Sequence, residues 1–319
     1  MTYMILNTGN RTDIPAFFPE WFFRRLEAGF VYARNPYVPN QITEYTLDPS
    51  LVDIICFCTK NPAPLLRKEA QNKSRAQLLQ SFRQYWQVTI TPYGREIEPY
   101  VPPVSEVLRS FRDLSGRVGA ERAAWRYDPV FLTEEYTEAF HCNTFQEMAE
   151  SLRGFTHTVI ISFLDLYAKT RRNFPEGTEV PGETQISLTR AFSEIARSNG
   201  MELRTCMESP ELARYGADTT GCMTKEVLEH AFSESLQIPG SIGRSREGCD
   251  CLLGADIGAY NTCGHGCRYC YANYDRASVE RNLRLHDPSS PLLLGHVQEG
   301  DRIVPARQSS YVTGQMTLF

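Results

Sequence analysis

The sequence predicts an α/β fold, a TIM-like (β/α) barrel, complete or incomplete, followed by a cysteine-rich segment. Short apolar runs alternate with amphipathic segments over the first 239 of 319 residues, and several apolar runs end in a cluster of polar residues. After about residue 239 this periodicity is lost and cysteines accumulate. Alternating strands and helices favour a parallel sheet, and this number of units favours a barrel or a large doubly wound sheet.

The expected strands are nearly continuous apolar runs, which is typical of parallel strands buried on both faces. They are residues 3–6, 30–33, 52–57, 87–90, 123–126, 156–162 and 202–205. The expected helices carry apolar residues at helical spacing. They are residues 20–28, 73–85, 104–114, 144–152, 185–198 and 225–233.

These patterns predict that the chain has three parts. Residues 1–239 form the expected barrel domain, and residues 240–280 form a cysteine-rich segment that we expect a metal centre to organise on the barrel. Residues 281–319 have two apolar patches and weak structural signals, and we expect a C-terminal tail.

Composition excludes some classes of protein. The chain is 42% hydrophobic and 22% charged, as in an ordinary soluble protein, and it has no long apolar run that predicts a membrane span. It opens without a secretory leader, so we expect a cytoplasmic, reducing environment. The net charge of −5 does not suggest a generic polyanion binder, although a local basic groove is compatible with it.

Polar clusters follow the expected strands, and barrels build their active sites at that end. From these clusters we expect a substrate pocket in which cations bind an anionic group, such as a phosphate, and carboxyl groups move protons or pair with the cations. The candidate pocket residues are Arg11, Asp13, Lys60, Arg126, Asp128 and Glu208.

Seven of the ten cysteines lie between Cys206 and Cys270, and three of them form the pattern Cys263-Gly-His-Gly-Cys267-Arg-Tyr-Cys270. Clustered thiols in a reducing compartment indicate metal binding, and a [4Fe–4S] cluster takes thiolate ligands. Three cysteines leave one iron without a ligand from this loop. A structural zinc site is the main alternative, although its usual paired short knuckles fit this spacing less well. A disulfide is the weakest interpretation.

The remaining cysteines of this region are Cys206, Cys222, Cys249 and Cys251. Four thiolates could hold a second [4Fe–4S] cluster. Alternatively, Cys206 and Cys222 are small core residues, or one of the four completes the first cluster. His265 lies inside the cysteine loop, where it binds a ligand or a sulfur atom, or else stabilises the loop.

Several longer motifs carry a resemblance to a known family. They are Arg11-Thr-Asp-Ile-Pro-Ala-Phe, Thr59-Lys-Asn-Pro, Trp125-Arg-Tyr-Asp-Pro, Cys249-Asp-Cys, and the segment from Asp256 to Asn273 that contains the cysteine loop. Together they resemble the bacterial family called domain of unknown function 1848, over nearly the whole chain. That family name implies no activity.

The cysteine loop is in turn similar to that of spore photoproduct lyase-like radical S-adenosylmethionine (SAM) proteins, which act on, or are linked with, damaged DNA. This resemblance implies that Cys263, Cys267 and Cys270 ligate a [4Fe–4S] cluster, that the open iron binds SAM, and that Tyr269 faces SAM. It also implies an electron donor such as a flavodoxin or ferredoxin. In radical SAM proteins the loop follows the first barrel strand, whereas here it comes last, and no Gly-Gly-Glu-like motif is evident.

The sequence therefore predicts an iron–sulfur protein, a radical SAM enzyme that acts on nucleic acid or a phosphorylated substrate. The alternative is a non-SAM electron-transfer or adaptor protein in DNA metabolism. The last five residues, Gln315-Met-Thr-Leu-Phe319, resemble the peptide by which bacterial repair proteins bind the sliding clamp. Leu318 and Phe319 would enter an apolar pocket and Gln315 would form a hydrogen bond. A packing tail is the alternative.

Overall fold

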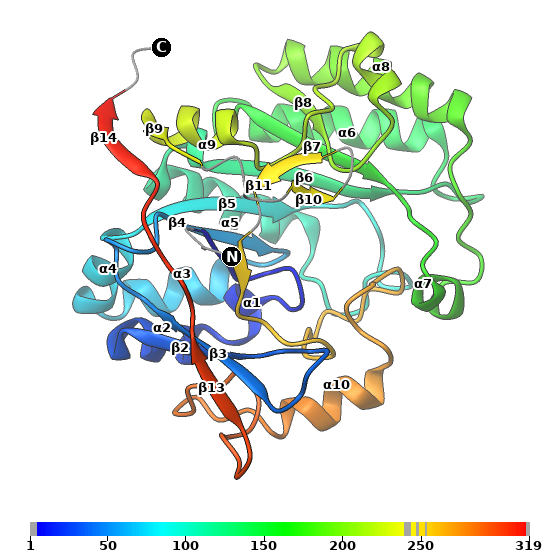
Figure 1. The fold of residues 1–319 in the computed structure, drawn as a ribbon. Coiled ribbons are helices and arrows are strands. Elements are labelled where there is room, and N and C mark those ends of the chain that lie inside the picture. Colours follow the sequence, from blue (N-terminus) through cyan, green and yellow to red (C-terminus); the bar gives the residue numbers. More distant parts are fainter. Residues whose placement is uncertain (1–4, 239–243, 247–248, 253, 317–319) are drawn as a thin grey trace.

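The main sheet has seven parallel strands in the spatial order β12-β1-β4-β5-β6-β7-β8 (Figure 1). The computed structural model describes residues 5–238, 244–246, 249–252 and 254–316. Within these residues the sheet has two free edges, so it is open and forms no closed barrel. The parallel α/β fold is confirmed. The strands are β1 (Ile5–Asn7), β4 (Ile54–Thr59), β5 (Arg83–Thr89), β6 (Ala123–Val130), β7 (Thr158–Phe163), β8 (Glu202–Thr205) and β12 (Ala255–Asp256).

Six of these strands, β1, β4, β5, β6, β7 and β8, are neighbours in the sheet in the same order as in the sequence. Right-handed crossovers that always step in one direction place the connecting helices on one face of the sheet, here called the helical face. Its core contains Phe57 stacked on Trp86, with ring centroids 4.0 Å apart, and Phe145 stacked on Phe192 at 4.2 Å. The helices that contribute to this core are α2 (Pro19–Ala28), α3 (Ala63–Ala70), α4 (Lys73–Gln80), α5 (Val104–Val118), α6 (Glu138–Leu152) and α8 (Gly182–Ser198).

The opposite face of the sheet, here called the inner face, has its own apolar cluster. Ile54, Tyr85 and Ile160 point into it from the strands, and Leu228 from helix α9 packs against them. Alternate residues of the strands therefore face two different cores, which explains their nearly continuous apolar sequence. The elements that cover this face are α9 (Lys225–Phe232), β9 (Glu234–Leu236) and β11 (Cys249–Leu252).

Two sequence predictions are wrong. Residues 30–33 are not a parallel strand of the main sheet, because β2 (Phe30–Arg34) pairs antiparallel with β3 (Gln41–Thr46) in a separate sheet, and only alternate residues of β2 are buried. The helix expected at 73–85 ends at Gln80 as α4, and Tyr85 belongs to β5. Tyr85 and Trp86 pack into the cores on opposite faces of the sheet, as strand residues do.

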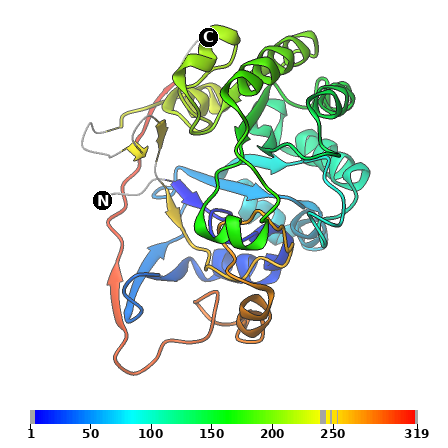
Figure 2. The same ribbon diagram turned by 90° about the vertical axis from the view of Figure 1, so that its right-hand side faces the viewer.

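The C-terminal segments are incorporated into the rest of the fold. Strand β13 (Arg302–Pro305) pairs with β3, and β14 (Val312–Met316) pairs with β9, so the last part of the chain runs along one side of the molecule (Figures 1 and 2). No helix among the described residues is long and apolar enough to span a membrane. The remaining elements are α1 (Ile14–Phe17), α7 (Ala168–Asn173), α10 (Arg276–Leu283), β10 (Arg244–Arg246) and the short 3₁₀ helices η1 (Ala120–Arg122) and η2 (Pro210–Tyr215).

Candidate functional site

The cysteine loop, residues 263–270, follows the edge strand β12. This strand pairs in parallel with β1, with Leu6 opposite Ala255 and Asn7 opposite Asp256. The carboxyl ends of parallel strands meet at one edge of a sheet, so the chain leaves β12 where barrels and open α/β sheets place their sites. The carboxylate of Asp256 fixes this exit by accepting hydrogen bonds from the amides of Asn10 at 3.0 Å and Gly258 at 2.6 Å.

Backbone hydrogen bonds hold the cysteine loop against the segment that follows β5. The amide of Tyr100 donates to the carbonyl of His265 at 3.1 Å, and the amide of Arg268 donates to the carbonyl of Ile97 at 3.0 Å. From α7, the hydroxyl of Thr170 donates to the carbonyl of Tyr269 at 3.3 Å. The loop therefore bridges the ends of strands on both sides of the sheet centre.

Asp13 is the main anchor of the loop at its other side. Its Oδ1 accepts from the Thr59 hydroxyl at 2.7 Å, and its Oδ2 accepts from the Lys60 amide and from His265 Nε2, both at 2.8 Å. His265 is only 2% exposed, and Nδ1 has no hydrogen-bond partner among the described residues. The structure thus gives His265 a loop-stabilising contact through Nε2 and leaves its Nδ1 without a partner among the described residues.

Lys60 and Tyr269 converge on a carboxylate that the sequence analysis did not select, Glu98. Lys60 Nζ lies 2.8 Å from Glu98 Oε1 and 2.9 Å from the hydroxyl of Thr91, and the Tyr269 hydroxyl also donates to Glu98. Burial acts to lower the pKa of Lys60, but Glu98, Cys267 and other negative neighbours outweigh it and raise the pKa. Lys60 is therefore a charged ammonium beside the cysteine loop.

The three thiols of the loop lie close enough to influence one another. Burial, followed by Asp13 and the other two thiols, raises the pKa of Cys263, and burial also raises the pKa of Cys270. The amide of Ala272 donates to Cys270 Sγ at 3.3 Å, and such N–H···S bonds are part of the environment that tunes iron–sulfur clusters. These donors fit a thiolate-bound cluster. In the described part of the chain, no group of three or more His, Cys, Asp or Glu side chains is arranged so that it could hold a metal ion.

A second polar group lies on the inner face at the ends of β5, β6 and β7. Arg126 donates to Gln87 Oε1 at 3.0 Å and forms an ion pair with Asp128, which also accepts a hydrogen bond from Ser162. Burial acts to lower the pKa of Arg126, but Asp128 and nearby thiols outweigh it and raise the pKa. Asp128 therefore pairs with a cation, which is one of the two roles that the sequence analysis gave it.

The two remaining candidate pocket residues lie apart from this group. Glu208 Oε1 accepts the amide of Phe163 at 2.7 Å, and burial raises the pKa of Glu208 to about 8, so the carboxyl group is mostly protonated at neutral pH. Arg11 lies at the β12 edge, where its Nε is 3.9 Å from Asp256 and its Nη1 is 3.4 Å from the carbonyl of Gly258.

The four other cysteines that the sequence pattern grouped lie on the inner face, in or against the apolar cluster below α9, together with Cys56 and Cys58 of β4. Cys222 Sγ lies 3.8 Å from Cys206 Sγ and 3.7 Å from Cys251 Sγ, and Cys249 belongs to the same cluster. These four residues are here called the second thiol group. At the C-terminus, Gln315 lies in β14, while Leu318 and Phe319 lie outside the described residues, so clamp binding stays a prediction.

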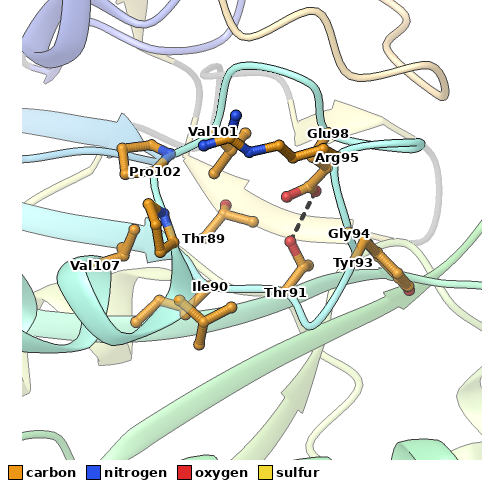
Figure 3. A pocket seen from close by; sticks show the side chains of 12 residues that line it. Thr89, Ile90, Thr91, Tyr93, Gly94, Arg95, Glu98, Val101, Pro102 and Val107 are labelled. Carbon is orange, nitrogen blue, oxygen red and sulfur yellow. Dashed lines mark hydrogen bonds between the residues drawn. The ribbon is translucent and has the colours of Figure 1, made fainter.

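A cavity of about 240 Å³ adjoins the site beyond Glu98. Figure 3 shows Glu98 and Thr91 hydrogen-bonded in its wall, with Arg95 beside them. Glu98 therefore contacts both the cavity and the cysteine loop. The cavity lies between the end of β5, the segment that follows it and the start of α5, and its lining residues are Thr89, Ile90, Thr91, Tyr93, Gly94, Arg95, Glu98, Val101, Pro102, Pro103, Val104 and Val107.

A family model described as "Domain of unknown function (DUF1848)" matches residues 5–272. This range contains the main sheet, the cysteine loop and the second thiol group. No curated protein matches the chain. The similarity to radical SAM proteins thus rests on the residues of the cysteine loop.

Proposed function

The chain belongs to the domain of unknown function 1848 family, whose name assigns no activity, and we propose its function from the site itself. It is an iron–sulfur protein whose cysteine loop holds a [4Fe–4S] cluster through Cys263, Cys267 and Cys270. It acts as a radical SAM enzyme at the carboxyl ends of the sheet strands. The alternative is an electron-transfer or adaptor protein with the same cluster and no SAM chemistry.

The observation that carries this proposal is the position of β12. In radical SAM proteins the cysteine loop follows the first barrel strand, and here it comes last in the sequence. In space, however, β12 is the edge strand beside β1, and the six sequential strands follow it across the sheet. The loop therefore leaves the sheet from the first position in space, so its late place in the sequence no longer argues against radical SAM chemistry.

The surroundings of the loop suit such a cluster. When bound, the cluster would supply the electron that cleaves SAM. The ammonium group of Lys60, next to Cys267, would offset part of the thiolate charge, and Asp13 would fix the loop through His265. Tyr269 donates its hydroxyl to Glu98 and packs its ring beside Phe131, with centroids 6.1 Å apart, and the part of the ring that stays accessible would contact an adenine. The side chains of Arg126, Asp128 and Ser162 form a hydrogen-bonded polar group on the inner face that would orient a substrate.

The rim of the loop favours a nucleic-acid substrate. Tyr100, Tyr271 and Tyr274 are each 49% exposed there. Arg276 lies over the ring of Tyr100 at 5.0 Å, and Arg172 lies over the ring of Tyr274 at 4.5 Å. Unstacked bases bind to proteins by stacking on aromatic rings and guanidinium planes. A single-stranded or unstacked base is therefore the substrate class that this rim supports best.

The test is anaerobic reconstitution with iron and sulfide, followed by reduction with dithionite or a flavodoxin in the presence of SAM. We expect about four irons and four sulfides at the loop and the release of 5′-deoxyadenosine. The triple variant C263S/C267S/C270S should lose both, whereas C142S, which changes a half-buried cysteine in α6, should lose neither. A bound cluster without SAM cleavage would favour the electron-transfer alternative. Protein that binds no iron would exclude both the radical SAM and the electron-transfer proposals.

A further inference from the structure

The second thiol group joins three segments that are distant in the sequence. Cys206 follows β8, Cys222 lies in the segment before α9, and Cys249 and Cys251 lie in β11. In β11 these two cysteines alternate with exposed Asp250, so both lie on its buried side. These four of the thiols on the inner face thus come from three segments.

The spacing of the sulfurs distinguishes a single ion from a cubane. Zinc binds thiolates at about 2.3 Å with tetrahedral geometry, which places two sulfurs about 3.8 Å apart. Two of the six sulfur–sulfur distances in the second thiol group, 3.7 Å for Cys222–Cys251 and 3.8 Å for Cys222–Cys206, match this value. In a cubane each thiolate binds a different iron and the inorganic core lies between them. Sulfurs in contact with one another leave no room for that core.

The backbone around Cys251 is arranged for a thiolate. Its Sγ accepts N–H bonds from Cys222 at 3.1 Å and from Met223 at 3.2 Å. Gly221 has a positive φ of 132°, and a Cβ there would lie 2.7 Å from Cys251 Sγ and 3.2 Å from Cys249 Sγ. The absence of a side chain at position 221 therefore leaves space for both sulfurs. Backbone donors to sulfur favour the negatively charged form that metal binding requires.

We propose that Cys206, Cys222, Cys249 and Cys251 bind one tetrahedral thiophilic metal ion, Zn²⁺, at a site separate from the cysteine loop. In the described residues the thiols form a row of contacts rather than a closed shell, and the ion closes it while the thiol protons pass to solvent. The ion ties β11 to the end of β8 and to the start of α9, and thereby holds the cover of the inner face. This inference does not depend on SAM chemistry.

The experiment uses the full chain with the loop variant C263S/C267S/C270S, so that the thiols of the cysteine loop cannot contribute. After exposure to Zn²⁺ and desalting, we expect one zinc per chain by elemental analysis. With Co²⁺ in its place we expect the intense visible bands of a tetrahedral thiolate site. Adding C222S/C251S to the loop variant should abolish both signals, and adding C142S should abolish neither.

A second variant guards against loss of folding. C249S changes one ligand and should weaken Co²⁺ binding by at least tenfold while the far-ultraviolet circular dichroism stays unchanged. The proposal is overturned if the loop variant binds no zinc, or if zinc is retained after the C222S/C251S change. It is also overturned if the loop variant holds about four irons and four sulfides at the second thiol group.

Discussion

His265 Nε2 lies 2.8 Å from Asp13 Oδ2, although the two residues are 252 positions apart in the sequence. The contact joins the segment after β1 to the cysteine loop after β12, which are neighbouring strands of the main sheet. Asp13 also caps α1 by accepting the amide of Ala16 at 3.0 Å. One carboxylate therefore fixes the start of a helix, the end of β4 and the cysteine loop at once.

The first prediction concerns Asp13→Asn. An asparagine has one acceptor oxygen and directs an amino group at donors, so at least one buried donor loses its partner. We expect the free energy of unfolding to fall by roughly 1–3 kcal/mol and iron incorporation to fall with it. Urea unfolding and iron analysis measure the two effects. D48N is the control, because exposed Asp48 makes similar local bonds to Ser50, and its stability should change by less than about 0.5 kcal/mol. Equal effects of the two variants would contradict the prediction.

The second prediction concerns the buried ion pair of Lys60 and Glu98, whose side chains are 12% and 2% exposed. Lys60→Met leaves Glu98 without its cation and should destabilise the fold by about 3–5 kcal/mol. The double variant K60M/E98Q removes both charges and should recover part of this loss. Chemical unfolding of the four proteins in a double-mutant cycle gives the coupling energy.

The matched control for this cycle is the pair Arg171 and Glu179, whose side chains are 62% and 72% exposed and whose charged atoms lie 3.4 Å apart. R171M, E179Q and their combination should change stability little, because solvent screens such pairs. If K60M and E98Q changed the free energy of unfolding additively, the charges of Lys60 and Glu98 would not stabilise each other, and the prediction would be wrong.

The parallel sheet was predictable because its strands are apolar on both faces, as in β4, where five of the six residues are buried. The same signal misled at residues 30–33, since a short apolar run does not reveal whether one face or two are buried. Strand β12 has only two residues, and its partner lies about 250 positions away, so no local pattern marks it. Its place could be found only from the fold.

The candidate site was predictable in part. Polar residues after β4 and in the second half of β6 drew attention to Lys60, Arg126 and Asp128, because the carboxyl ends of parallel strands meet. Glu98 was missed since it lies in an irregular segment between β5 and α5, and nothing in the surrounding sequence separates this buried carboxylate from exposed ones. Its role follows from Lys60 and Tyr269, which reach it from other strands and from the cysteine loop.

The third prediction concerns the pH dependence of stability through His141. Its Nε2 donates to the carbonyl of Phe131 at 2.8 Å and its Nδ1 accepts from the Tyr127 hydroxyl at 2.7 Å, with the side chain fully buried. Burial lowers the pKa of His141 below its ordinary value of 6.5. The unfolded chain then binds more protons than the fold below about pH 6.5. The stability that neutral His141 supplies is therefore complete above that pH and is lost as the pH falls.

The measurement is the difference between wild-type protein and H141Q in urea unfolding from pH 7.5 to 5. A difference is needed because Glu208, whose pKa burial raises to about 8, titrates in the same range with the opposite sign. We expect the advantage of wild type over H141Q to shrink as the pH falls. A constant difference across the range would show that His141 does not titrate between the two states.

The last prediction compares two glycines with left-handed backbone, Gly221 and Gly29. At Gly29 φ is 75° and an added Cβ meets nothing within 4 Å, so G29A should cost only the backbone strain, about 1–2 kcal/mol. At Gly221 the added methyl group also strikes Cys251 Sγ, and overpacking of this kind adds about 1–3 kcal/mol. Urea unfolding after treatment with a chelator separates this steric effect from metal binding.

The double variant G221A/C251A tests the cause. Removing the Cys251 sulfur makes space for the new methyl group, so the double variant should be more stable than the sum of the two single effects implies. In G29A/C251A the two changes in the free energy of unfolding should add, because an added Cβ at Gly29 meets nothing within 4 Å. If G221A costs no more than G29A, or if both combinations are additive, then the sulfurs of the second thiol group do not lie against Gly221 in solution. The tetrahedral site would in that case lose its geometric basis.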